Sequence, residues 1–195
     1  MKGCRPLTIE EQKEIRDSFH GRHATRNKLI FTLGVHTGFR ISELLSIRVK
    51  DVWNGSGPRE SVQVRRASMK GRKNGRIVPL NAVARRAISE YMDEYALPVN
   101  SPLFPSQMNP KQPFNRQRAH AILSEVFTGC GLDGSTATHS LRKTFAWAVY
   151  KVTGGNIHAV QQMLGHANIA TTVSYLGFSH EEASDIVNKI ADLYQ

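Results

Sequence analysis

The sequence predicts a mainly α-helical domain with a small antiparallel β-sheet, an α+β fold. Apolar residues recur at helical spacing over most of the chain, and capping residues stand at the ends of these segments. Two short segments of alternating character, joined by a glycine-bearing turn, are typical of a β-hairpin. The length of 195 residues, with 40% hydrophobic and 22% charged residues, fits one globular domain, which we expect to cover residues 1–195.

Boundary residues mark the expected helices. Thr8 and Glu11 form a capping box that starts a helix ending near Gly21. Gly38 closes the next helix, which is more apolar, and Asn81 caps a later one. The sequence predicts helices over residues 8–21, 24–36, 40–47, 81–95, 115–128, 139–153, 156–164, 168–176 and 180–194.

The expected hairpin has strands over residues 61–67 and 76–80, joined by the turn SMKGRKNG. A basic two-stranded ribbon can lie along a DNA groove, and a lysine at its tip can reach a phosphate. The turn is not a nucleotide-binding P-loop, because it lacks the G-x-x-x-x-G-K-[ST] spacing. Six basic residues and no acid occur from residue 65 to residue 76, which favours a surface that faces DNA: Arg65, Arg66, Lys70, Arg72, Lys73 and Arg76.

Residues 97–113 contain five prolines, so they predict an irregular connection that crosses the surface between two helical lobes. At the other end of the chain, residues 180–194 place apolar side chains on one helical face. That face can pack on the domain's own core or on a partner. It consists of Ala183, Ile186, Val187, Ile190 and Tyr194.

The segment LGHANIATTVSYL, residues 164–176, predicts a break between two helices. Each residue of a continuous helix advances by about 100°, so His166 and Tyr175 would face opposite sides of one helix. Gly165 can end the first helix in a left-handed cap, and Asn168 can start the second. The sequence therefore allows the phenol to fold back toward the imidazole.

Composition narrows the class of partner. The formal net charge of +10 and the pI near 9.9 favour a polyanion, nucleic acid before membrane. No apolar run approaches the roughly 18 residues that a membrane span needs, and no signal peptide is recognisable. Cys4 and Cys130 form neither a disulfide framework nor a CxxC pair, so we expect a reducing cytosol.

Two short motifs place cations beside helix starts. In THSLRKTF, His139 and Arg142 share a helical face in the first turn, where the helix dipole favours an anion such as phosphate. In TGFRISELL, Glu43 lies three residues after Arg40 and can hold its guanidinium. Taken alone, each motif is better explained as an ordinary solvated helix face.

No HExxH motif, Cys/His metal pattern or acidic two-metal cluster is present in the sequence. We therefore expect no cofactor and no metal. Cleavage of a phosphodiester without metal needs a protein nucleophile and cationic side chains that stabilise the transition state. Tyr175 is the candidate nucleophile.

Four motifs in order resemble the catalytic domain of the tyrosine recombinase (phage integrase) family. They span about 140 residues and read TGFRISELLSIRVKDV, KGRKNGRIVPL, THSLRKTFA and LGHANIATTVSYL. The resemblance implies the DNA breaking-rejoining fold of that family. It also implies site-specific recombination, such as integration, excision or inversion of a mobile element, through a covalent 3′-phosphotyrosyl intermediate without metal or ATP.

The resemblance assigns roles to individual residues. Tyr175 matches the nucleophile that attacks the scissile phosphate. Arg40 and Arg142 match the two arginines that clamp its non-bridging oxygens, and Glu43 matches an acid that supports the first of them.

Three further positions complete the implied catalytic set. Lys70 matches the lysine that protonates the departing 5′-oxygen, although Lys73 on the same turn is an alternative. His139 matches a histidine that handles protons and contacts the phosphate. His166 matches a position that is histidine or tryptophan in relatives. The side chains expected to contact DNA around this set are Arg65, Arg66, Arg72, Lys73, Arg76 and Lys143.

The implied partners are double-stranded DNA and other protomers of the same chain, as a tetrameric synapse, with residues 178–195 as a segment that docks on a neighbour. The implied setting is the cytoplasm, on the nucleoid of a prokaryote or phage host. No N-terminal DNA-gripping domain of the family fits before Thr8, so both an excised domain and a catalytic-only recombinase stay open. Two alternatives for function also stay open: relaxation of supercoils by a type IB topoisomerase, and a DNA-binding module without catalysis.

Overall fold

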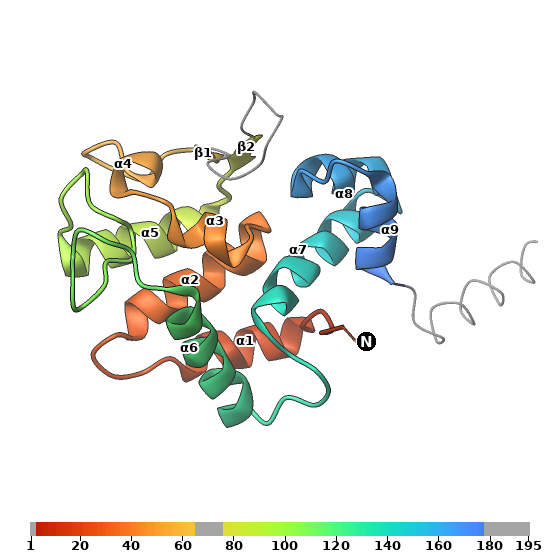
Figure 1. The fold of residues 1–195 in the computed structure, drawn as a ribbon, viewed down its shortest axis with the longest axis horizontal. Helices are drawn as coiled ribbons and strands as arrows, with labels where there is room; N and C mark the ends of the chain where they lie inside the picture. The colour runs from red at the N-terminus through yellow and green to blue at the C-terminus, as the bar shows by residue number, and fades with distance from the viewer. Residues whose placement is uncertain (1–2, 65–75, 178–195) are drawn as a thin grey trace, which may run out of the picture.

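The structure, a computed structural model, describes residues 3–64 and 76–177 (Figure 1). Helices dominate this part of the chain, and a two-stranded antiparallel sheet is inserted between α4 and α5. The elements are α1 Ile9–Ser18, α2 Ala24–Thr37, α3 Ile41–Leu45, α4 Val49–Val52, β1 Ser61–Val64, β2 Arg76–Pro79, α5 Ala82–Tyr95, α6 Arg116–Gly129, α7 Thr138–Val152, α8 Ile157–Leu164 and α9 Ile169–Leu176. The expected α+β fold class is confirmed.

The cap residues explain where these helices begin and end. Thr8 accepts from the Glu11 backbone N–H and Glu11 accepts from that of Thr8, so the expected capping box is present. Asn81 caps α5 through Ala84 N–H. The single-turn helix α4 was not predicted, since four residues are too few to show a helical period.

The core is built around α2, which packs against α5 and α7 (Figure 1). Leu29, Ile30 and Leu33 of α2 are fully buried. Gly34 lets α7 approach closely, because a Cβ on this residue would overlap the Leu141 side chain. A smaller apolar cluster that includes Val160 joins α7, α8 and α9. The helix α7 therefore connects the main core to the part of the chain that carries the break at residues 165–168.

The β-hairpin pairs Val62 with Val78 and Val64 with Arg76. Val62, Val64 and Val78 are buried, whereas Ile77 faces outward with 68% of its surface exposed. One face of the hairpin thus belongs to the core and the other to solvent.

The proline-rich connection is irregular, as predicted, but it does not only cross the surface. Leu103 and Phe104 are fully buried. The buried Tyr91 hydroxyl donates to the Leu103 carbonyl over 2.9 Å. The expectation of a surface crossing was therefore wrong for the middle of residues 97–113. Removing the large apolar side chains of Leu103 and Phe104 from water is favourable, and this favours burial of that part of the loop.

The expected turn at residues 65–75 and the expected helix over residues 180–194 lie outside the described residues. Among the helices of the described ranges, none combines the length and the apolar character that crossing a bilayer requires.

Candidate active site

One carboxylate, that of Glu43, lies among three arginines. Its Oε1 accepts from Arg40 Nη1 and its Oε2 from Arg76 Nη2, each over 2.9 Å. Arg142 Nη1 lies 3.9 Å from Oε2. Burial alone would raise the Glu43 pKa, but the positive charges of Arg76, Arg40 and Arg142 and the Arg40 backbone N–H hold it below the ordinary value. The cluster keeps an excess of positive charge, which suits an anionic ligand.

Local structure explains how the first arginine reaches this place. Gly38 ends α2 in the left-handed conformation, with φ of 61°. Arg40 then stands at the N-cap of α3 in extended conformation, and its backbone N–H donates to Glu43 Oε2 over 2.9 Å. The predicted contact between Arg40 and Glu43 is thus confirmed, as a bond that also closes the first turn of α3.

Arg142 is buried in α7, with 3% of its surface exposed. Its Nη1 donates to the Gly38 carbonyl and its Nη2 to the Leu164 carbonyl over 2.8 Å. Burial, followed by the charges of Arg40 and Arg76, lowers the Arg142 pKa to about 10. The guanidinium therefore stays charged at neutral pH and is fixed by backbone groups from α2 and α8.

Arg76 points into the protein from the first position of β2. Its Nη1 donates to the Leu164 carbonyl and, over 3.1 Å, to the Met163 carbonyl at the end of α8. Its guanidinium carbon lies 5.6 Å from the centre of the Phe39 ring. The sequence assigned Arg76 to a DNA-facing ribbon, whereas its observed partners are protein groups, so it ties β2 to both Glu43 and α8.

His166 and Tyr175 lie against one another, as the expected helix break allows. Gly165 caps α8 with φ of 65°, and Asn168 caps α9 through Ala170 N–H. The two rings meet edge to face, with centroids 5.6 Å apart and planes at 79°. The predicted fold-back of the phenol toward the imidazole is confirmed.

The His166 ring is buried, and its Nδ1 lies 2.9 Å from Thr172 Oγ1. Burial, followed by the charges of Arg142, Arg40 and Arg76, lowers the His166 pKa to about 4. His166 is therefore neutral near pH 7, and it can serve as a hydrogen-bond donor or acceptor but not as a standing cation.

The Tyr175 hydroxyl donates to the His139 backbone carbonyl over 3.4 Å, at the first turn of α7. Lys143 Nζ lies 5.6 Å from the centre of the Tyr175 ring. Burial raises the Tyr175 pKa to about 12, although Arg142 and Arg40 oppose the shift. The phenol is therefore neutral near pH 7.

His139 is exposed, and its backbone carbonyl is the one that accepts from the Tyr175 hydroxyl. Desolvation of its ring, with the charges of Arg142, Arg40 and Lys143, holds its pKa below the ordinary histidine value. An exposed neutral imidazole at the start of α7 can accept a proton from a neighbouring group.

The structure thus brings together eight of the residues named from the sequence, which come from α3, β2, α7, α9 and the turns beside them: Arg40, Glu43, Arg76, His139, Arg142, Lys143, His166 and Tyr175. Five others lie outside the described residues: Arg65, Arg66, Lys70, Arg72 and Lys73.

Sequence reasoning missed Thr172 and the carbonyls of Gly38 and Leu164. A backbone carbonyl carries no sequence signal. Thr172 does carry one, since it stands three residues before Tyr175 on the same helical face.

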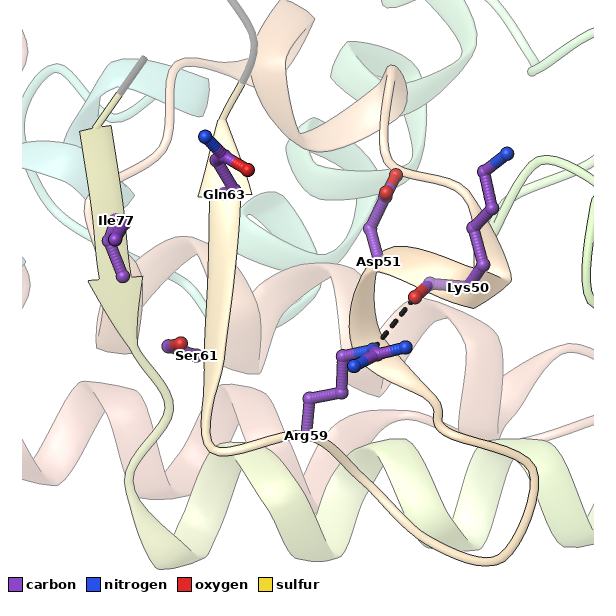
Figure 2. Close-up of a pocket in the computed structure, with 6 residues that line it drawn as sticks. All are labelled: Lys50, Asp51, Arg59, Ser61, Gln63 and Ile77. Carbon is purple, nitrogen blue, oxygen red and sulfur yellow. Dashed lines mark hydrogen bonds between the residues drawn. The ribbon is translucent and has the colours of Figure 1, made fainter. Parts of the chain in front are cut away.

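A cavity of about 520 Å³ lies beside the outward face of the hairpin (Figure 2). The Arg59 side chain extends toward α4, where its Nε donates to the Lys50 carbonyl over 2.8 Å. The residues that line it are Lys50, Asp51, Arg59, Ser61, Gln63 and Ile77, none of which belongs to the arginine cluster. Over the described ranges, no three His, Cys, Asp or Glu side chains gather as a metal site would require.

Comparisons with known proteins found relatives in sequence and in fold. The tyrosine recombinase XerD of Halalkalibacterium halodurans is 30% identical over 189 residues, which cover 92% of this chain and 59% of that protein. The crystal structure of XerA recombinase matches with a TM-score of 0.78 and 27% identity, over 97% of this chain and 64% of that chain.

A structure of XerH site-specific recombinase, bound to palindromic difH substrate in a post-cleavage complex, matches with a TM-score of 0.72. The identity is 23%, over 93% of this chain and 51% of that chain, so this likeness supports the fold. The chain therefore spans about three fifths of the length of its XerD relative.

The phage integrase family matches residues 6–182. Because that match covers most of the 195 residues and includes the arginine cluster, both histidines and Tyr175, the chain belongs to the phage integrase family.

Proposed function

We propose that this chain is the catalytic domain of a site-specific DNA recombinase or integrase, which cleaves and rejoins strands through a covalent 3′-phosphotyrosyl intermediate. One observation carries the proposal: a phenol, a neutral imidazole and two arginines held by one carboxylate converge from segments far apart in the chain. Phosphoryl transfer to a tyrosine requires this combination of nucleophile and fixed positive charge.

In the proposed reaction, the Tyr175 oxygen attacks the scissile phosphorus. The new bond joins that oxygen to the 3′-phosphate, and the bond from phosphorus to the 5′-oxygen breaks. The phenol loses a proton and the departing 5′-oxygen gains one, so protons balance. Rejoining reverses these steps and needs no ATP, since the phosphotyrosyl bond conserves the phosphodiester.

Arg142 and Arg40 have the position to stabilise the transition state. The Arg142 guanidinium is fixed by two backbone carbonyls, so it needs no reorganisation when charge develops on the phosphate. Both arginines also lower the free energy of the phenolate form of Tyr175, against the effect of burial. Losing one such group from a preorganised site costs about 10²–10³ in rate.

Proton transfer is assigned to groups around the phenol. The Tyr175 hydroxyl bonds to the His139 backbone carbonyl, and the exposed imidazole of the same residue, with its pKa below the ordinary value, is the proposed acceptor of the phenol proton. Lys70 is the proposed donor to the 5′-oxygen, with Lys73 as the alternative.

The proposed substrate is double-stranded DNA, and the proposed assembly is a tetramer of protomers on it, with residues 178–195 docking on a neighbour. The charge of +10 and the basic segment from residue 65 support DNA as partner. XerH, a structural neighbour, is bound to its difH substrate, which supports the same class of partner for this fold. The proposed setting is the cytoplasm of a bacterium or phage host, where the domain would integrate, excise or invert a mobile element.

The test is a covalent trap. Duplexes nicked beside candidate cleavage points release a short fragment after attack, so the adduct persists and survives denaturation. We expect an adduct with the unaltered protein and with Tyr95→Phe, a control whose hydroxyl lies at Arg22 and His23, away from the cluster. We expect none with Tyr175→Phe. An undiminished adduct with Tyr175→Phe would contradict the proposal, and binding of every duplex without adduct would indicate a DNA-binding module.

A second assay separates recombination from supercoil relaxation. We expect strand exchange between two sites on linear duplexes. Relaxation of a supercoiled plasmid without exchange would instead indicate a type IB topoisomerase.

A further inference from the structure

The Thr172 hydroxyl is fully buried on α9, one turn before Tyr175. Two other buried helical threonines donate their hydroxyl proton to a carbonyl four residues back: Thr37 to Leu33 over 2.6 Å, and Thr144 to Ser140 over 2.8 Å. The Thr172 hydroxyl instead lies 2.9 Å from Nδ1 of His166. This threonine thus departs from the usual local bond of its residue type.

The proton of this hydroxyl has one acceptor in the described part of the chain, the Nδ1 atom of His166. A buried donor left without an acceptor costs about 1–3 kcal/mol. A neutral imidazole carries its proton on one nitrogen and a lone pair on the other. If Thr172 donates to Nδ1, the imidazole proton must be on Nε2.

The surroundings of His166 keep the ring neutral. The groups that act on it are Arg142 of α7, Arg40 at the start of α3, Arg76 of β2 and the Glu43 carboxylate, so cations outnumber the acid. A second proton on the imidazole would place one more positive charge among these arginines. The Nε2–H group makes no hydrogen bond to protein within the described ranges, so it is available to a ligand.

We propose that Thr172 is a positioning residue, which fixes His166 as the neutral Nε2–H tautomer and so presents an N–H donor, rather than a base, to the anion between Arg40 and Arg142. The identity of that anion as the scissile phosphate rests on the proposed function. The hydroxyl acts through the imidazole and does not itself touch the phosphate. Because Thr172 and Tyr175 both belong to α9, the same helix positions the residue that orients the His166 N–H donor and the proposed nucleophile.

The first measurement needs no variant. Two-bond nitrogen–proton correlations of protein labelled with 15N-histidine report which imidazole nitrogen carries the proton. We expect His166 to show the Nε2–H tautomer near pH 7 in the unaltered protein. The Nδ1–H tautomer, or a protonated ring, would overturn the proposal.

The second measurement compares Thr172→Val, which keeps the shape but removes the hydroxyl, with Thr172→Ser, which keeps the hydroxyl. We expect Thr172→Ser to retain the tautomer. We expect Thr172→Val to lose the single Nε2–H pattern and to slow adduct formation on nicked duplex about tenfold or more, with DNA affinity unchanged. A merely structural threonine would change neither the tautomer nor the rate of adduct formation at saturating DNA, and that result would also overturn the proposal.

Failure of the proposed function is distinguishable from failure of this inference. If the unaltered protein forms no adduct, recombination chemistry fails, whereas the tautomer pattern in the unaltered, Val and Ser proteins still decides the role of Thr172.

Discussion

The Glu43 carboxylate accepts a hydrogen bond from the Arg76 guanidinium over 2.9 Å, although the residues are 33 positions apart. The same Oε2 atom accepts the Arg40 backbone N–H and lies 3.9 Å from Arg142. A single acid therefore orients the start of α3, the start of β2 and the buried guanidinium of α7. Without it, three like charges would be left close together.

Replacing Glu43 by Gln tests this arrangement. The amide keeps the shape but loses the charge, so bonds to two guanidinium groups weaken. We expect the free energy of unfolding to fall by about 2 kcal/mol and adduct formation on nicked DNA to fall at least about tenfold. Urea unfolding and the adduct assay measure the two effects. Glu14→Gln, an exposed change on α1, is the control. Equal behaviour of the two variants would show that Glu43 does not organise the cluster.

Replacing Arg76 by Ala decides between an internal and a DNA-facing role. Because its guanidinium binds Glu43 and the carbonyls of Met163 and Leu164, we expect lower stability, by about 2 kcal/mol, and an unchanged salt dependence of DNA affinity. A phosphate contact would instead reduce the slope of log affinity against log salt by about one. Lys73→Ala, in the basic turn, is expected to reduce that slope and serves as the positive control. A reduced slope for Arg76→Ala would support the role in DNA binding that the sequence suggested.

The low pKa of His166 predicts a pH dependence of stability. In the unfolded chain its imidazole takes a proton near pH 6.5, whereas in the folded protein the pKa is about 4. Between these values the unfolded state binds more protons, so stability falls as the pH is lowered from about 6.5 toward about 4. Urea unfolding at about pH 7 and about pH 5 measures the loss.

His166→Gln is the comparison, because it removes the imidazole in question and leaves the rest of the sequence unchanged. We expect the variant to lose less stability over this interval than the unaltered protein. Equal losses would mean that His166 is not held neutral.

Gly38→Ala should destabilise the protein and disturb Arg142 together. Gly38 has φ of 61°, and a Cβ there would overlap the Phe145 ring. We expect a loss of about 2–4 kcal/mol from left-handed strain and overpacking. Gly21→Ala is the matched control, since its φ is 78° but no atom lies within 4 Å of the added Cβ.

Calorimetry of both glycine variants separates backbone strain from the clash. Adduct formation should fall only for Gly38→Ala, because the Gly38 carbonyl accepts a bond from Arg142. Equal losses of stability in the two variants would show that the Phe145 ring moves away from the added methyl group without lowering the free energy of unfolding.

Local sequence signals were sufficient for most helix boundaries and for the break that brings His166 to Tyr175. Glycine and asparagine at that break act within a few residues, so their effect is visible in the sequence. The helix α4 escaped prediction because one turn shows no period. Burial of the middle of the proline-rich connection was not predicted, because it depends on contacts with other parts of the fold. One such contact is the hydrogen bond from the Tyr91 hydroxyl to the Leu103 carbonyl.

The candidate catalytic set was reached through family motifs, and local spacing predicted the contacts of Arg40 with Glu43 and of His166 with Tyr175, whereas the contacts of Arg142 were not predicted. Nothing local to Arg142 indicates that the Gly38 and Leu164 carbonyls receive its guanidinium. Such contacts join residues that are distant in the chain, and only the packing of α7 against α2 and α8 brings them together.

The sequence by itself determined the mainly helical fold, the helix break, the basic character and the identity of the candidate nucleophile. The tertiary structure alone decided which way Arg76 points. In the strand Arg-Ile-Val-Pro, either Ile77 or Val78 could face the core, and alternation then sends Arg76 outward or inward. Pairing with β1 buries Val78 and exposes Ile77, so Arg76, two residues before Val78, turns inward to Glu43.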